Sequence, residues 1–464
     1  MAQNQQLPGV APAAPAIWRN PEFRAVVYQV LVVLAVVAAG YVIFQNTLTN
    51  LRERGISTGF AFLRNEAGFG ISETMPIPRL EAGFLHFIIS LLIGIAVVYG
   101  MSRWAAARGR TIGDDLPLVL GVILFIVVIP VLVLYINGNN ILTDSYDPTK
   151  TYGLALKTGL VNTVKVSLLG CVLATILGTI LGIARLSSNW LVARLATLYV
   201  EIIRNIPPLL QIFFWYFAVL RALPNVRNSV EFWGFAVLNN RGVYLPDPVP
   251  QGPAPMLGLA FVAGLIGAYL WARHSRLHQE ATGNRLPVFW PGLGIVLLPM
   301  VLVRLILGEP FELTYPELRG FNYRGGLVVT PEFAAMLMAL VMYTAAFIAE
   351  TVRSGILAIS RGQREAAMAL GLRPGQVLWL VVLPQALRVI IPPMTSQYLN
   401  LTKNSSLGVA IAFPELVSVG GTILNQSGQA IEVIGLTMAV YLTFSLLISL
   451  FMNWYNAKIR LVER

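Results

Sequence analysis

The chain has 464 residues, of which 56% are apolar and only 12% are charged. This composition excludes an ordinary soluble globular protein and indicates an integral membrane protein. The single cysteine, Cys171, excludes an internal disulfide and a Cys-rich metal site.

Ten apolar segments are long enough to cross the hydrocarbon layer of a bilayer, which needs about 20 helical residues. They are residues 25–44, 84–101, 116–136, 158–184, 197–220, 256–272, 287–307, 332–352, 377–399 and 430–453. We therefore predict an all-α polytopic membrane protein with about ten transmembrane helices.

The net charge of +11 is explained by topology. With the N-terminus placed in the cytoplasm, the excess of Lys and Arg falls on the segments predicted to lie inside, as the positive-inside rule requires. Both termini are then cytoplasmic. The basicity does not indicate nucleic-acid binding.

The N-terminal third precedes the part of the chain that carries motifs. Residues 1–24 are rich in Ala, Pro and Gln and predict a disordered cytoplasmic tail. Residues 25–157 form an extension with three spans, the first of which is too long for a signal peptide and predicts an uncleaved anchor. From residue 158 onward, Gly170, Gly178 and Gly182 place small residues on one helix face and predict close packing with a neighbouring helix.

Polar residues and prolines interrupt the span 197–220. They are Glu201, Arg204, Asn205, Pro207, Pro208 and Gln211. Two adjacent prolines leave carbonyl groups without partners and predict a broken helix. Ionisable residues inside a span usually face protein or a water-filled path, so Arg204 is expected either to line such a path or to pair with Glu201.

Residues 221–331 form an insertion with two spans and external loops. Between the spans, His274 and His278 lie four residues apart and could share a helix face. Metal binding would need a third ligand, and several Arg residues surround the pair, so a solvated basic loop is predicted and no metal site.

The span 332–352 ends with Glu350, one helical turn before Arg353. The two residues predict either a local ion pair or a polar wall or gate of a transport path. The span 377–399 contains Pro384 and the pair Pro392-Pro393, which predict a second broken helix. Beyond it, the amide and hydroxyls of Asn404, Ser405 and Ser406 could line a polar path or satisfy freed backbone groups.

Between these two spans lies a polar loop, residues 360–384 (SRGQREAAMALGLRPGQVLWLVVLP). Its first part predicts a short helix capped by the side chains of Ser360 and Gln363. Gly371 fits the left-handed position after a helix, and Pro374 fits the first position of the next helix. The small side chains from Glu365 onward predict a surface that a partner can approach closely.

Three motifs resemble known sequences. Glu365-Ala366-Ala367, Gly371 and Leu383-Pro384 resemble the EAA loop of the membrane subunits of ATP-driven (ABC) importers. The resemblance implies that these six residues form a coupling helix and its exit, docked on a cytoplasmic ATPase. The Arg204 to Gln211 stretch and Lys403-Asn404-Ser405-Ser406-Leu407 resemble motifs of permeases for polar amino acids, which implies a substrate path containing Arg204, Asn205, Pro207, Gln211, Asn404, Ser405 and Ser406. Glu350 is a further candidate for this path because of its position at the end of a span.

The resemblance is strongest to the longer permease subunits of general L-amino-acid importers. It implies a five-helix permease core in residues 158–220 and 332–464, in a bacterial inner membrane. It also implies an ATPase dimer, a second related permease, a periplasmic amino-acid-binding protein and an amino-acid substrate. The chain lacks the GxxxxGK[ST] motif, so no cofactor is expected in it, and ATP and Mg²⁺ are expected on the ATPase.

Two alternatives remain at this point. A secondary, ion-coupled amino-acid transporter would explain the broken helices and the charges in the spans, but not the spacing of the EAA motif. A membrane enzyme would need a convergent catalytic cluster, and three scattered histidines do not indicate one.

Overall fold

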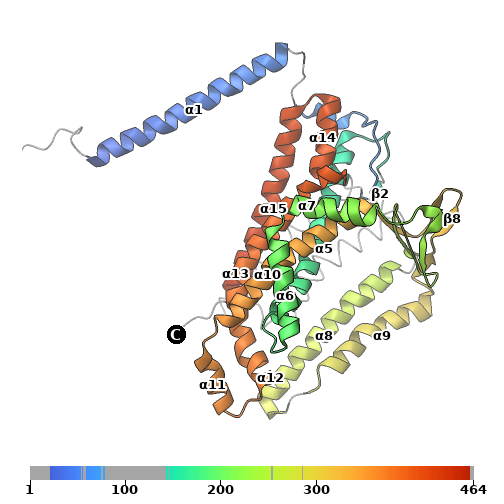
Figure 1. Cartoon of the computed structure of the whole chain (residues 1–464), viewed down its shortest axis with the longest axis vertical. Helices are drawn as coiled ribbons and strands as arrows, with labels where there is room; N and C mark the ends of the chain where they lie inside the picture. The colour runs from blue at the N-terminus through green and yellow to red at the C-terminus, as the bar shows by residue number, and fades with distance from the viewer. Residues whose placement is uncertain are drawn as a thin grey trace, which may run out of the picture.

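The computed structural model describes most of the predicted helices (Figure 1). The described residues are 21–53, 55, 59–74, 77–78, 143–144, 146–251, 254–284 and 286–459. The predicted tail therefore lies almost wholly outside the described residues, as do the predicted spans 84–101 and 116–136.

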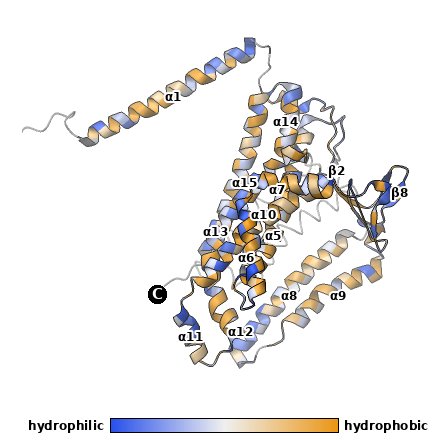
Figure 2. Cartoon of the chain, in the orientation of Figure 1, coloured by the Kyte–Doolittle hydropathy of each residue, from blue (hydrophilic) through white to orange (hydrophobic). Residues whose placement is uncertain are grey.

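Seven described helices are long and apolar enough to cross a membrane, and one bent helix pair would make an eighth. The spans are Phe23–Asn50, Tyr152–Ala184, Met256–Thr282, Phe289–Leu307, Pro331–Leu357, Pro374–Ile411 and Ala430–Asn456, with Trp190–Asn205 and Pro208–Leu220 as the bent pair. Each contains or overlaps one predicted span. The helices that carry them are α1 (Pro21–Glu53), α5 (Tyr152–Ala184), α8 (Ala254–Thr282), α9 (Phe289–Leu307), α10 (Pro331–Leu357), α13 (Leu383–Asn404) and α15 (Ala430–Ile459). Apolar residues cover these helices on most sides, whereas α11 (Arg361–Ala369) is largely hydrophilic (Figure 2).

The predicted break in the fifth span is confirmed. Helix α6 (Trp190–Asn205) ends before Ile206, and α7 (Pro208–Phe213) starts at Pro208 after a bend of 107°. A π-helical stretch, η5 (Phe214–Leu220), completes the segment. The proline pair therefore turns the chain sharply between the two helices.

The predicted break in the ninth span is wrong. The short helix α12 (Pro374–Gln376), the π-helical η7 (Val377–Val382), α13 and the 3-10 helix η8 (Ser405–Ile411) follow one another as a single span. Pro392 and Pro393 lie inside α13. Neighbouring helices stabilise such prolines in membranes, and α13 packs against α10 and α15. The helix therefore passes through its prolines.

Helices α5 and α10 form the centre of the core, and the glycine face predicted on α5 is confirmed. A Cβ atom added at Gly178 would lie 2.6 Å from the Cβ of Ile348, and one at Gly182 would lie 2.8 Å from the carbonyl oxygen of Ala349. Gly170 faces Leu401 of α13. A larger residue at Gly178 or Gly182 would force the two helices apart.

The insertion contains strands that the sequence did not predict. Helices α8 and α9 pack against each other, and their connections to the core carry small antiparallel sheets. The strands are β3 (Val230–Phe232), β4 (Ala236–Asn239), β5 (Gly242–Leu245), β6 (Asp247–Pro250), β7 (Phe311–Thr314), β8 (Glu317–Arg319), β9 (Asn322–Arg324) and β10 (Leu327–Val329). The largest sheet has the order β10-β5-β4-β3, and the pairs β6-β7 and β8-β9 form two more.

Smaller elements cover the end of the bundle opposite α11. Helix α14 (Leu416–Ser427) stands beside the start of α15 (Figure 1). The 3-10 helix η2 (Ala61–Arg64) and the strand pair β1 (Ile77–Pro78) and β2 (Thr143–Asp144) belong to the N-terminal extension, and the 3-10 helix η6 (Val226–Asn228) precedes β3. We refer to the two ends of the bundle as the α11 end and the α14 end.

Candidate functional site: the coupling loop and the polar residues of the core

Helix α11 ends in a rigid turn. The N–H of Gly371 donates to the carbonyl of Met368 (2.9 Å), and the N–H of Leu372 donates to the carbonyl of Ala367 (3.3 Å). These two bonds define a Schellman motif, and Gly371 has the positive φ (81°) that the motif needs. The predicted role of Gly371 is confirmed. The predicted side-chain cap at Ser360 is wrong, because its backbone carbonyl, and not its hydroxyl, accepts the N–H of Gln363.

Helix α11 is fixed to the core by two of its own residues. Ala367 is only 4% exposed and packs in the main hydrophobic core beside the start of the next span. Arg364 donates from Nη2 to the carbonyl oxygen of Ile356 at the end of α10 (2.9 Å). The following turn starts at Arg373, whose N–H donates to the side chain of Gln376 (2.9 Å).

The remaining residues of α11 form an exposed surface. Glu365, Ala366 and Ala369 are exposed, and the apolar side chains of Met368 and Leu370 are 49% and 84% exposed. The burial of Ala367 corrects the prediction that it lies on the docking surface, because its methyl group faces the chain's own core. Of the predicted exit residues, Pro384 is exposed and Leu383 is half-buried.

Glu350 on α10 is the centre of an ion-pair network at the α11 end. It accepts a hydrogen bond from Arg185 at the end of α5 and one from Arg353 (3.2 Å). Arg204 of α6 lies 3.7 Å from the same carboxylate, and its guanidinium also lies over the ring of Phe347. The local pair of Glu350 and Arg353 is therefore confirmed, and Arg204 pairs with Glu350 instead of Glu201. The network joins three helices and leaves an excess of positive charge.

Gln211 stabilises the broken helix. Its Nε2 donates to the carbonyl oxygens of Ile203 and Ile206, both at 3.0 Å, and the side chain is buried. These carbonyls lie directly before the Pro207-Pro208 break, where the carbonyl of Ile203 also accepts the N–H of Ile206 (3.4 Å). Asn205 likewise donates to the carbonyl of Glu201. The amide nitrogen of Gln211 therefore satisfies backbone carbonyls, and its place in a substrate path stays a prediction.

The predicted polar group after α13 also bonds to its own backbone. Ser405 is fully buried and donates to the carbonyl of Thr402 (2.7 Å), and Ser406 donates to that of Lys403 (2.7 Å). Asn404 is half-buried. Of the two predicted roles of the serines, the structure supports the satisfaction of freed backbone groups.

The predicted path residues do not converge. The hydroxyl of Ser405 lies 3.5 Å from that of Tyr441, which donates to Glu415 before α14. The start of α10 lies close by, because Phe333 contacts Phe413, two residues before Glu415. Glu350 lies 17 residues further along the same helix, which corresponds to about 25 Å. Glu350 therefore lies far from Ser405, whereas α7, which carries Gln211, packs beside η8, which starts at Ser405.

Glu415 is a buried acidic residue that no motif indicated. It caps α14 by accepting the N–H groups of Val417 (2.8 Å) and Ser418 (2.7 Å), and Tyr441 donates to it (3.3 Å). Burial without a cationic partner raises the pKa of this carboxyl to about 7. The unusual choice of Glu at a helix start, directly after Pro414, was the only sequence signal.

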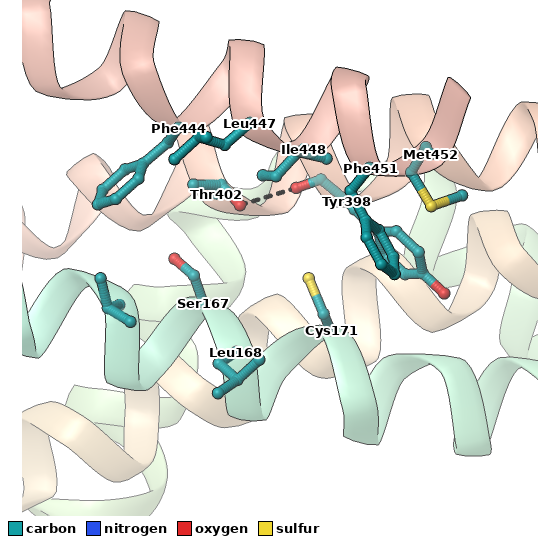
Figure 3. Close-up of a pocket in the computed structure, with 11 residues that line it drawn as sticks. Ser167, Leu168, Cys171, Tyr398, Thr402, Phe444, Leu447, Ile448, Phe451 and Met452 are labelled. Atoms are coloured by element: carbon teal, nitrogen blue, oxygen red, sulfur yellow. Dashed lines mark hydrogen bonds between the residues drawn. The ribbon is translucent and has the colours of Figure 1, made fainter. Parts of the chain in front are cut away.

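An apolar groove runs between α5, α13 and α15 (Figure 3). Its volume is about 360 Å³, and Cys171, Tyr398 and Phe451 lie on its three walls. The hydroxyl of Thr402 faces away from it toward the carbonyl of Tyr398 (2.9 Å), and the hydroxyl of Ser167 makes no hydrogen bond. None of the predicted path residues lines this groove, and its lining does not suit a zwitterion.

Comparison with known proteins gives the family. Residues 281–461 match the model described as "Binding-protein-dependent transport system inner membrane component". The chain is 42% identical over 445 residues to the general L-amino acid transport system permease protein AapQ of Rhizobium johnstonii, covering 96% of this chain and 94% of the relative. It is 43% identical over 447 residues to the putative amino-acid ABC transporter permease protein YhdX of Escherichia coli, with 96% of each chain covered.

A shorter match agrees with these two. The chain is 45% identical over 314 residues to the glutamate/glutamine/aspartate/asparagine transport system permease protein BztB of Rhodobacter capsulatus, which covers 61% of this chain and 73% of that one. The helical bundle, the exposed loop helix between two spans and these identities agree with one another. The chain belongs to the family of permease subunits of ATP-driven (ABC) amino-acid importers.

Proposed function

We propose that this permease transmits ATP hydrolysis to the transport path through α11. The observation that carries the proposal is the exposed surface of α11, made of Glu365, Ala366, Ala369, Met368 and Leu370, on a helix fixed to the core. Coupling to a motor requires a rigid contact, because a flexible loop would absorb the movement. The Schellman turn at Gly371 and the bond from Arg364 supply that rigidity.

Membership of the family defines the cellular context of this proposal. Its members are multi-pass proteins of the bacterial inner membrane that work with an ATPase subunit and a substrate-binding protein. We propose that α11 faces the cytoplasm, with both termini on that side, because the ATPase is cytoplasmic and the excess positive charge then lies inside. ATP and Mg²⁺ are proposed to bind the ATPase dimer alone.

We propose L-amino acids as the substrates and a second, related permease as a partner. The names of the relatives support the substrate class. Only 6% of the residues in the apolar stretch of α15 are buried within this chain, so another helical surface or lipid must cover this helix. The proposed organisation is a permease core in residues 158–220 and 332–464, with the extension 25–157 and the insertion 221–331 added to it.

Within the core, we propose Arg204 and Glu350 as path or gate residues. They belong to different helices, and the pair is partly exposed, with 40% and 32% of the two side chains accessible. A change in the angle between α6 and α10 would separate them. Among the other predicted path residues, the side chains of Asn205, Gln211, Ser405 and Ser406 donate to nearby backbone carbonyls.

The energy source tests the proposal directly. The complete transporter, reconstituted in liposomes, is expected to take up L-glutamine when ATP and its binding protein are supplied, and to continue after ionophores collapse all ion gradients. The ATPase subunit is expected to co-purify with this chain in detergent. Uptake that needs an ion gradient and no ATPase would contradict the proposal.

A further inference from the structure

Residues 59–74, here called the extension segment, pack on the α14 end of the core. Phe62 and Ala67 of this segment form a hydrophobic cluster with Val419 and Ile423 of α14. The N–H of Ala67 donates to the carbonyl of Lys150, and other backbone bonds join the segment to the chain before α5. The segment is therefore held firmly over this end of the bundle.

The extension segment inserts one acidic side chain between core helices. Glu73 is 8% exposed, and its Oε2 lies 3.4 Å from Nζ of Lys165 on α5. Its other carboxylate oxygen accepts a hydrogen bond from the hydroxyl of Thr330 at the start of α10. The backbone carbonyl of Glu73 accepts a bond from Nδ2 of Asn162 (3.0 Å). One carboxylate thus receives a cation and a hydroxyl from two different helices.

The core residues around Glu73 have interaction groups that its carboxylate does not use. Lys165 remains 30% exposed and lies 4.2 Å from the ring centre of Phe333. Asn162 is fully buried, and its Oδ1 makes no hydrogen bond, although its Nδ2 also donates to the carbonyl of Pro414 (2.9 Å). A buried amide oxygen without a donor is costly and is normally paired. The site therefore has a place for a carboxylate and an unused acceptor next to it.

We propose that Lys165, Thr330 and Asn162 form a binding site for an α-amino acid, and that Glu73 is a tethered carboxylate that occupies it. Lys165 and Thr330 would hold the substrate carboxylate, and the free Oδ1 of Asn162 would accept a hydrogen bond from the α-ammonium group. The inference rests on the proposed substrate class. Glu73 then competes with substrate, and the measured affinity equals the intrinsic affinity multiplied by the fraction of molecules in which Glu73 has left the site.

The competing explanation is a structural ion pair that clamps the extension segment to the core. The two explanations predict opposite changes in substrate affinity when Glu73 is replaced. In a clamp, Glu73 and Lys165 support the same contact, so the loss of either has the same effect. In a tethered competitor, the loss of Glu73 frees the site, whereas the loss of Lys165 destroys it.

The tethered competitor and the structural clamp can be separated by equilibrium binding. We propose to measure the binding of radiolabelled L-glutamine to the complete transporter in lipid nanodiscs, without binding protein. Glu73→Gln preserves the side-chain shape, and we expect it to bind glutamine at least about fivefold more tightly than the unmodified transporter. Lys165→Met should bind at least about tenfold more weakly, since each 1.4 kcal/mol of lost interaction is a factor of ten. L-Glutaminamide, which lacks the α-carboxylate, should bind weakly to all variants and show no loss in Lys165→Met.

Matched controls are available in the same elements. Glu66→Gln changes an exposed acidic residue of the extension segment, and Lys157→Met changes an exposed lysine of α5; both should leave binding unchanged. Thermal unfolding of each variant checks that the fold persists. The inference is overturned if Glu73→Gln and Lys165→Met both weaken binding and the exchange of the two charges restores it. It is also overturned if no variant binds glutamine, whereas a failure of the coupling proposal would appear separately as a missing ATPase partner.

Discussion

A transporter that carries Gly371→Asp in this subunit is expected to reach the membrane and to lose most of its substrate-stimulated ATP hydrolysis and uptake. Gly371 has a φ of 81° and closes the Schellman turn that ends α11. The left-handed conformation costs a residue with a side chain about 1–2 kcal/mol. Such a cost lowers the ratio of correctly formed to altered turn by about 5- to 30-fold. ATP hydrolysis and uptake, measured in proteoliposomes, should fall by a similar factor.

Two substitutions control for side-chain size and charge. Asn and Asp are similar in size and both adopt the left-handed region more readily than most residues with a side chain, but Asn carries no charge, so Gly371→Asn should retain more activity than Gly371→Asp. Gly375 is exposed in the same loop and has no such constraint, so Gly375→Asp should have little effect. Glu365→Lys, which reverses a charge on the exposed surface, should weaken coupling without changing the turn. Full activity in Gly371→Asp would remove α11 as the coupling element.

The second large effect is expected for Glu350→Gln. Arg185 contacts this carboxylate, and the side chain of Arg185 is only 9% exposed. Loss of the Glu350 carboxylate therefore leaves a nearly buried guanidinium without its anion. Removing one partner of a buried ion pair typically costs about 3–5 kcal/mol. We expect a fall in thermal stability in detergent, together with a loss of uptake, because the ion-pair network that links α5, α6 and α10 at this end is lost.

The neighbouring arginine provides the matched control. Arg353 is 37% exposed and pairs with Glu350 from the same helix, so Arg353→Gln should cost less than about 1 kcal/mol. Combining Glu350→Gln with Arg185→Gln should recover part of the lost stability, because no unpaired buried charge remains. Equal effects of Glu350→Gln and Arg353→Gln would show that the link between helices contributes nothing.

Features that depend on local backbone chemistry could be predicted from the sequence. Gly371 occupies the one position after α11 that needs a positive φ, and Pro207-Pro208 marks the 107° bend. The glycines of α5 likewise indicated its contact with α10. Each of these follows from a backbone preference or a missing side chain, which is visible without knowledge of the rest of the fold.

Features that depend on distant partners could not be predicted. Glu350 is 165 residues from Arg185 in the sequence, and Glu73 is 92 residues from Lys165. Sequence patterns identify such charges as unusual but do not identify their partners. The same limit explains Gln211, whose two carbonyl partners, those of Ile203 and Ile206, are identified only by the structure of the break.

Short elements and the burial of individual small residues could not be predicted from the sequence either. The strands of the insertion have three or four residues, too few to show a period of two. Ala367 shares its small size with Ala366 and Ala369, but only packing against the next span decides which of the three is buried. Which residues of α11 form its exposed surface could therefore be determined only from the structure.

Site-specific cross-linking tests the coupling claim most directly. Cys171 is the single cysteine, so a Cys171→Ser background leaves one introduced thiol. From Ala366→Cys or Ala369→Cys, which lie on the same helix face, a short cross-linker is expected to capture the ATPase subunit, whereas the buried Ala367→Cys should capture nothing. If neither exposed position captures a nucleotide-hydrolysing subunit in the active transporter, α11 is not the coupling helix.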